Sequence, residues 1–166
     1  MKFKTILRNV FASVCVAAAL AAVVAPHQAS AKKNKKIGIQ LYSVMSAVQK
    51  DPKASIERLA DLGYNNVELV QWGGVTKVFG MAPADFKALC DDNGVKIVST
   101  HSSIQEDPAK EAEIEARWRQ LFEIQKACGG RYFVIPSYGV DYTEAGLKQM
   151  CDYFNRIGKI AAEYGL

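Results

Sequence analysis

The 166-residue sequence has little histidine and lacks two common motifs. His27 and His101 are its only histidines, and none of its four cysteines forms a Cys-x-x-Cys pair. No Gly-x-Gly-x-x-Gly follows the first predicted strand, which counts against the nucleotide-binding form of an open α/β sheet.

The sequence also lacks a basic stripe once its N-terminus is set aside. Lys2, Lys4 and Arg8 precede an apolar run at residues 10–25, and a small-residue site for signal peptidase ends at Ala31. The apolar run is too short and too rich in alanine for a convincing membrane span. We therefore expect residues 1–31 to be a signal peptide cut after Ala31, which directs the protein to the periplasm or outside the cell. A retained membrane anchor is the alternative.

Removing this leader brings the chain close to electrical neutrality. The whole sequence has a net charge of +4, and the leader contains three basic residues and no acidic one. The remaining excess of positive charge is concentrated at residues 32–36, which we interpret as a basic linker exposed to solvent. We expect no nucleic-acid partner, since no basic patch of the kind that binds phosphate backbones remains.

The cysteines outside the leader are Cys90, Cys128 and Cys151. In an exported protein, two of the three could form a disulfide and leave one free thiol. We favour free thiols in the core, because Cys90 follows Leu89 on an apolar helix face and Cys151 follows Met150.

An internal repeat organises the sequence. Pro52 and Pro83, which begin predicted helices, lie 31 residues apart, and so do Gly63 and Gly94, which end them. A strand follows each glycine. The same order of helix, glycine and strand continues to Gly129.

Strands and helices alternate throughout the part after the leader. The predicted strands are 37–43, 66–70, 95–100 and 131–135, and predicted helices begin near residues 52, 83, 108 and 143. In the first strand, Gln40 and Tyr42 share the face opposite the aliphatic side chains. The fourth strand is apolar throughout, as expected where both faces of a sheet are covered. This order predicts right-handed crossovers and a parallel α/β sheet.

Two architectures fit this order: a doubly wound open sheet and part of an eight-fold βα barrel. Polar residues lie at or near the carboxyl ends of successive strands, namely Tyr42, Ser43, Glu68, His101 and Ser137. Barrel enzymes place their chemistry at these ends, so the barrel is favoured.

Several segments together resemble the sugar phosphate isomerase/epimerase family, whose fold is the xylose-isomerase-like TIM barrel. The segments that carry the resemblance are 37–44, 62–69, 92–101, 133–137 and 153–158. The fold class expected is therefore α/β of the (βα)8 TIM-barrel type. Residues 37–166 form about four βα units, the N-terminal half of a barrel.

The resemblance implies a sugar isomerase or epimerase that moves a proton between adjacent carbons through an enediolate. It also implies a divalent metal ion (Mn, Mg, Co or Zn) held by Glu, Asp and His side chains of later strands. We expect the main metal ligands beyond Leu166 and the catalytic activity to be incomplete in this chain. The expected partner is a small sugar.

Two residues are candidates for catalysis. Glu68 points away from Val67 and Leu69, toward the barrel axis, where a carboxylate is costly unless it meets a cation, water or a polar ligand. His101 ends a strand and can act as an acid or base near neutral pH. An internal ion pair for Glu68 and a structural role for His101 are the alternatives.

Substrate contacts are predicted at Gln40, Tyr42, Trp72 and Ser137. Gln40 and Tyr42 share the axial face, Trp72 could stack on a sugar ring or pack its own loop, and Ser137 follows the fourth strand. Aromatic helix residues are interpreted as core (Trp118, Phe122 and Phe154).

Other functions remain open at this point. The chain could be an inactive, truncated half barrel or a carbohydrate-binding remnant, with open sheet edges that favour self-association. Related barrels also include hydrolases and apurinic-site endonucleases, although the near-neutral charge counts against an endonuclease.

Overall fold

The computed structural model describes residues 35–71 and 74–166. The chain divides into the units Met1–Lys35 and Lys36–Leu166, and every helix and strand reported below belongs to the second unit. The expected signal peptide, its cut after Ala31, most of the basic linker and Trp72 lie outside the described residues. Within the described part, no helix is long and apolar enough to cross a membrane.

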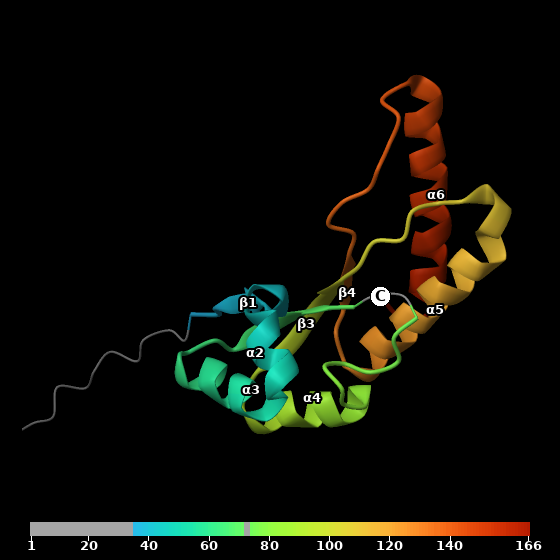
Figure 1. Ribbon diagram of the computed structural model, residues 1–166. Helices are drawn as coiled ribbons and strands as arrows, with labels where there is room; N and C mark the ends of the chain where they lie inside the picture. Colours follow the sequence, from blue (N-terminus) through green and yellow to red (C-terminus); the bar gives the residue numbers. More distant parts are fainter. Residues whose placement is uncertain (1–34, 72–73) are drawn as a thin grey trace, which may run out of the picture. The chain divides into compact units, whose positions relative to one another are not determined.

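Four parallel strands form one sheet in the order of the sequence, β1-β2-β3-β4 (Figure 1). They are β1 (Gly38–Gln40), β2 (Asn66–Val70), β3 (Lys96–His101) and β4 (Tyr132–Val134). A doubly wound sheet reverses its strand order at a switch point, whereas a barrel adds each new strand to the same edge. The sequential order therefore confirms the barrel-type prediction, in the form of four βα units.

In the described part of the chain, seven helical segments connect and follow the strands. They are the 3₁₀ turns η1 (Leu41–Val44) and η2 (Pro108–Lys110) and the α-helices α2 (Met45–Lys50), α3 (Pro52–Asp61), α4 (Pro83–Asp92), α5 (Glu111–Ala127) and α6 (Glu144–Glu163). Helix α3 begins as predicted, with the Asp51 side chain accepting a hydrogen bond from the amide of Ala54 at 3.0 Å. Gly63 and Gly94 follow α3 and α4 with φ of +91° and +67°, values that favour glycine and end the helices.

The first strand is shorter than predicted. The prediction of a strand over residues 37–43 is wrong after Gln40, because the chain turns there into η1 and then α2, a helix that the sequence pattern did not reveal. Leu41 is fully buried in the core beneath the sheet. Its burial favours the early turn over a longer strand. Tyr42 therefore does not share the axial face of β1 with Gln40.

One face of the sheet is covered by helices. Val67, Leu69 and Ile97 project from β2 and β3 into a core that also contains Ile56 of α3 and Phe86 of α4. Each of these side chains is at least 96% buried. Burial of a large aliphatic or aromatic side chain contributes about 1.5–3 kcal/mol, so this layer accounts for much of the fold's stability. The opposite face of the sheet remains for polar residues.

A second core joins α5 to α6. Trp118 stacks on Phe122, with ring centroids 5.5 Å apart, and both contact Phe133 of β4. The indole nitrogen of Trp118 donates to the hydroxyl of Tyr153 at 2.7 Å, and that hydroxyl donates to the carbonyl of Ile104 at 2.8 Å. The predicted core positions at Trp118 and Phe122 are confirmed, while Phe154 is partly buried.

The loop after β3 is also held to α6. The carboxylate of Glu106 accepts hydrogen bonds from Arg156 at 2.8 Å and Gln149 at 2.9 Å. The guanidinium of Arg156 lies 5.5 Å from the centre of the Tyr153 ring, which adds a cation–π contact. These contacts hold the loop between β3 and η2 against α6.

Two expectations about burial are wrong. Strand β4 is not covered on both faces, since Tyr132 and Val134 are 60% and 37% exposed. Cys151 is exposed, because the buried stripe of α6 runs through Tyr153, Ile157 and Ile160. The placement of Cys90 in the core is confirmed.

Candidate functional site

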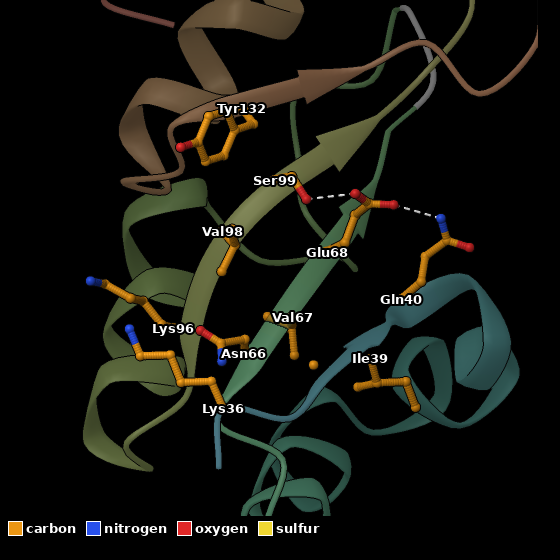
Figure 2. A pocket seen from close by; sticks show the side chains of 11 residues that line it. Lys36, Ile39, Gln40, Asn66, Val67, Glu68, Lys96, Val98, Ser99 and Tyr132 are labelled. Atoms are coloured by element: carbon orange, nitrogen blue, oxygen red, sulfur yellow. Dashed lines mark hydrogen bonds between the residues drawn. The ribbon is translucent and has the colours of Figure 1, made fainter. Parts of the chain in front are cut away.

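A row of side chains crosses all four strands at one level. Gln40 of β1 pairs in register with Glu68 of β2, Glu68 with Ser99 of β3, and Ser99 with Tyr132 of β4. Figure 2 shows Gln40 and Ser99 pointing toward the carboxylate of Glu68 from either side. The row lies on the face opposite the helix-covered core, which is where a barrel places its axis.

A register shift in β3 sets this row. Val67 pairs with Ile97, but the next residue, Glu68, pairs with Ser99, so Val98 has no partner in β2. One extra residue in a strand reverses which face the following side chains occupy. Without the shift Ser99 would follow Ile97 into the core. With it, Ser99 faces Glu68.

The carboxylate of Glu68 accepts a hydrogen bond on each oxygen. The hydroxyl of Ser99 donates to Oε2 at 2.5 Å, and the amide nitrogen of Gln40 donates to Oε1 at 2.6 Å (Figure 2). The Glu68 side chain is 22% exposed. Burial works to raise the pKa of this carboxyl, but the hydrogen bonds from Ser99, Gln40 and His101 outweigh burial and lower the pKa below 4.5. Glu68 is therefore ionised at neutral pH.

His101, two residues beyond Ser99, completes the cluster. Its Nδ1 lies 2.9 Å from the amide nitrogen of Gln40 and 3.3 Å from Oε1 of Glu68. When Gln40 donates one proton to Glu68 and the other to Nδ1, the neutral imidazole carries its own proton on Nε2. When the imidazole gains a proton, Nδ1 can donate to Glu68 instead.

The cluster borders two hollows. One, of about 650 Å³, runs along the open face of the sheet and includes Lys36 and Lys96 near the amino ends of the strands (Figure 2). Gln40, Glu68 and Ser99 also line it. The other, of about 480 Å³, lies at the carboxyl ends of the strands and includes His101 and Tyr42. Both volumes fall within the range of about 300–1,000 Å³ found for small-ligand sites.

The structure brings together three of the residues singled out from the sequence, namely Gln40, Glu68 and His101. Tyr42 lies close to them although it is in η1, with its ring centre 6.2 Å from that of His101 in an edge contact. Ser137 is exposed and lines neither hollow, and its carbonyl accepts a hydrogen bond from the hydroxyl of Ser103 at 2.8 Å.

Ser99 is the member of the cluster that the sequence reasoning missed. Simple alternation from Val95 and Ile97, both buried in the core, places Ser99 on the helix side. The sequence nevertheless contains a signal. Val95 and Ile97 are aliphatic, whereas Ser99 and His101, the next residues in the same alternation, are polar. A phase that changes from aliphatic to polar in mid-strand is typical of a bulge.

The residues described do not fit a divalent metal centre on their own. Among residues 35–71 and 74–166, no group of three or more His, Cys, Asp or Glu side chains is placed to hold a metal ion. Glu68 and His101 together offer two ligand side chains, whereas protein sites for zinc usually have three or four.

Sequential parallel strands with helices on one face and polar residues on the other define half of a (βα)8 barrel. The model of the xylose isomerase-like TIM barrel family matches residues 56–166, about two thirds of the sequence. The chain belongs to this family. No curated protein matches it.

Solved structures agree with this assignment. Two sugar phosphate isomerase/epimerases from Parabacteroides distasonis match with TM-scores of 0.71 and 0.69 and identities of 25% and 28%. These matches cover 79% and 82% of this chain and 51% of each of those chains. The IOLI protein, solved with a bound zinc atom, matches with a TM-score of 0.63 at 15% identity, over 80% of this chain and 49% of its own, and shows the fold alone. The chain spans about half the length of the structures it matches.

Proposed function

We propose that the protein acts on a small sugar as part of an isomerase or epimerase, with Glu68 and His101 transferring the proton. The observation that carries this proposal is the contact between the Glu68 carboxylate and the His101 imidazole, 3.3 Å apart and bordering both hollows. Family membership supports the reaction class.

The chemistry requires one base and a route for returning the proton. A proton leaves the carbon next to the sugar's carbonyl, the electron pair moves to the carbonyl oxygen, and the resulting enediolate takes a proton back at the neighbouring carbon or on its other face. Glu68 can accept the first proton because its carboxyl is ionised at neutral pH. His101 can then hold or return a proton, and Gln40 and Ser99 keep the carboxylate in position.

A metal ion would supply further stabilisation of the enediolate oxygens. The zinc atom in the IOLI protein supports metal use among structures of this fold. For this protein we propose that the main ligands of any such ion are residues other than Glu68 and His101.

We further propose that the protein is exported. The basic residues, apolar run and small-residue site at positions 1–31 support a cleavable leader. The mass of the protein recovered from the periplasm or medium tests this proposal directly. Cleavage after Ala31 gives an N-terminal Lys32, and an uncut chain in the membrane fraction would refute it.

Solvent deuterium incorporation tests the reaction. The protein is incubated in D₂O with D-fructose or D-xylulose, with and without added Zn²⁺ or Mn²⁺, and the carbon-bound protons next to the carbonyl are followed by NMR. Proton transfer through an enediolate exchanges these protons for deuterium. We expect Glu68→Gln to slow exchange about 10²- to 10⁴-fold, the usual contribution of a general acid or base.

The matched control is Glu123→Gln, which changes an exposed carboxylate on the outer helix α5. It should exchange at the rate of the unmodified protein. Equal exchange in Glu68→Gln and the control would refute the catalytic role of Glu68. Sugar binding without exchange in any condition would favour a carbohydrate-binding protein over an enzyme.

A further inference from the structure

The hollow at the carboxyl ends of the strands has a lining unlike that of the axial face. The ends of β2 and β3 and the segments that follow β1 and β4 contribute to it, and α5 adds one residue. It is lined by Tyr42, Val70, Gln71, His101, Ser102, Ser103, Arg117 and Pro136. We call this hollow the mouth cleft. Its volume of about 480 Å³ accommodates a ligand larger than a single small ion.

Two of its polar side chains belong to residues that are largely buried. Gln71 is 3% exposed and Ser102 is 5% exposed. Neither side chain makes a hydrogen bond to any other residue in the described part of the chain. Their polar atoms are not among the fully buried, unpaired side-chain atoms, so solvent reaches them from the cleft. Both groups can donate a hydrogen bond to a ligand in the mouth cleft.

Arg117 of α5 adds a cation to these donors. Its guanidinium forms no ion pair or hydrogen bond with another described residue. The nearby arginines of the helices differ: Arg119 pairs with Glu115 and Glu163, and Arg156 pairs with Glu106. The mouth cleft therefore has one positive charge that is not neutralised from within the described chain.

Among the described residues, no acidic residue lines the mouth cleft. Glu68 contacts His101 but lines the hollow on the axial face and is not part of the mouth cleft's lining. A cleft with one guanidinium, an amide, hydroxyls and no carboxylate is electrostatically matched to a single negative charge.

We propose that the mouth cleft binds the carboxylate of a sugar acid, with Arg117 as its principal partner and Gln71 and Ser102 as additional donors. A carboxylate suits the planar fork of one guanidinium and a charge of −1, whereas a phosphate dianion would leave one of its charges unmatched in this cleft. That the bound molecule is a sugar rests on the proposed function, whereas recognition of the carboxylate rests on the mouth cleft itself.

This arrangement places the group that recognises the substrate's carboxylate, Arg117, in the same cleft as one member of the Glu68–His101 pair. His101 lines the mouth cleft and also contacts Glu68. A carboxylate held at Arg117 anchors the ligand in the cleft that contains the His101 imidazole. Arg117 is thus assigned a role in choosing the substrate, separate from the role of Glu68 in proton transfer.

Calorimetric titration of the protein with three probes tests the proposal. D-glucuronate carries the carboxylate, D-glucose lacks it, and D-glucose 6-phosphate replaces it with a phosphate on a similar ring. We expect D-glucuronate to bind at least about 10-fold more tightly than either of the others, the gain of a charge-assisted bidentate pair.

Substitution of Arg117 distinguishes this role from general packing. Arg117→Gln should weaken D-glucuronate binding about 10- to 100-fold and leave D-glucose binding unchanged, while Arg117→Lys should restore part of the loss. Arg58→Gln, an exposed arginine of α3 that lines neither hollow, is the matched control and should bind D-glucuronate normally. Circular dichroism of each variant establishes that it is folded.

Two results would overturn the proposal. One is equal binding of D-glucuronate and D-glucose, or D-glucuronate binding unaffected by Arg117→Gln in folded protein. The other is a preference for D-glucose 6-phosphate that depends on Arg117. Binding of D-glucuronate through Arg117 without deuterium exchange in any sugar would leave this inference standing and refute the catalytic proposal alone.

Discussion

The hydroxyl of Ser99 lies 2.5 Å from Oε2 of Glu68 because β3 contains one residue more than the segment of β2 with which it pairs. This extra residue, Val98, turns Ser99 away from the core and onto the open face. The hydrogen bond is one of three contacts that lower the pKa of Glu68. The local geometry of a strand therefore positions a hydroxyl that helps to lower the pKa of the candidate base.

Removing the Ser99 hydroxyl should weaken both the fold and the ionised state of Glu68. We expect Ser99→Ala to lower the free energy of unfolding by about 1.5–3 kcal/mol, the usual range for a hydrogen bond to a charged group. The pKa of Glu68 should rise. Urea unfolding and an NMR titration of the Glu68 carboxyl measure the two effects. Ser46→Ala, at an exposed position of α2, should change neither.

Stability should depend on pH through Glu68. Its pKa is lower in the folded protein than the ordinary value of 4.5. The contribution of the carboxylate to stability is therefore complete above about pH 4.5 and is lost as the pH falls through the folded-state value. The difference in unfolding free energy between the unmodified protein and Glu68→Gln should shrink as the pH is lowered through this window. A difference that grows toward acid would contradict the hydrogen-bonding pattern.

The hydroxyl of Tyr153 should stabilise the junction of α5, α6 and the loop after β3. Tyr153→Phe leaves the Trp118 indole and the Ile104 carbonyl without their partner, which should cost about 1–3 kcal/mol. Urea unfolding followed by tryptophan fluorescence measures the loss. Tyr142→Phe removes a hydroxyl from a residue that is 86% exposed and should leave stability unchanged.

Thiol reactivity should separate one cysteine from the other two. Burial raises the pKa of Cys90 and of Cys128 to about 12, so neither forms the reactive thiolate at pH 8. Cys151 is exposed. Iodoacetamide at pH 8 should therefore label Cys151 in the folded protein and should label Cys90 and Cys128 only after denaturation, as read by peptide mass mapping. Rapid labelling of Cys90 in the folded state would show that the core between the sheet and helices α3 and α4 opens.

The features predicted correctly from the sequence depend on residues close together in the chain. A proline begins and a glycine ends each of α3 and α4, and the glycines have the positive φ that ends a helix. Glu68 faces away from Val67 and Leu69, as alternation within one short strand predicts. Such patterns specify the elements and, through their order, the parallel sheet.

The features that could not be predicted depend on residues far apart. The bulge at Val98 exists only in relation to β2, and the contact between Gln40 and His101 joins residues 61 positions apart. Tyr42 was placed in a strand because alternation cannot reveal that Leu41 turns into the core. The apolar sequence of β4 is typical of a strand covered on both faces. The exposure of its side chains, however, depends on what packs against the sheet.

The most direct test of the central claim is the imidazole NMR spectrum of His101 during a sugar titration. His101 is the only histidine among the described residues, and a His27→Gln background removes the other signal of the chain. If the cluster around Glu68 is the sugar site, adding D-glucuronate or D-fructose to the ¹⁵N-labelled protein should shift the ring nitrogens of His101, and Glu68→Gln should alter that shift. Ring-nitrogen signals that stay unchanged at saturating concentrations of both sugars would contradict the account.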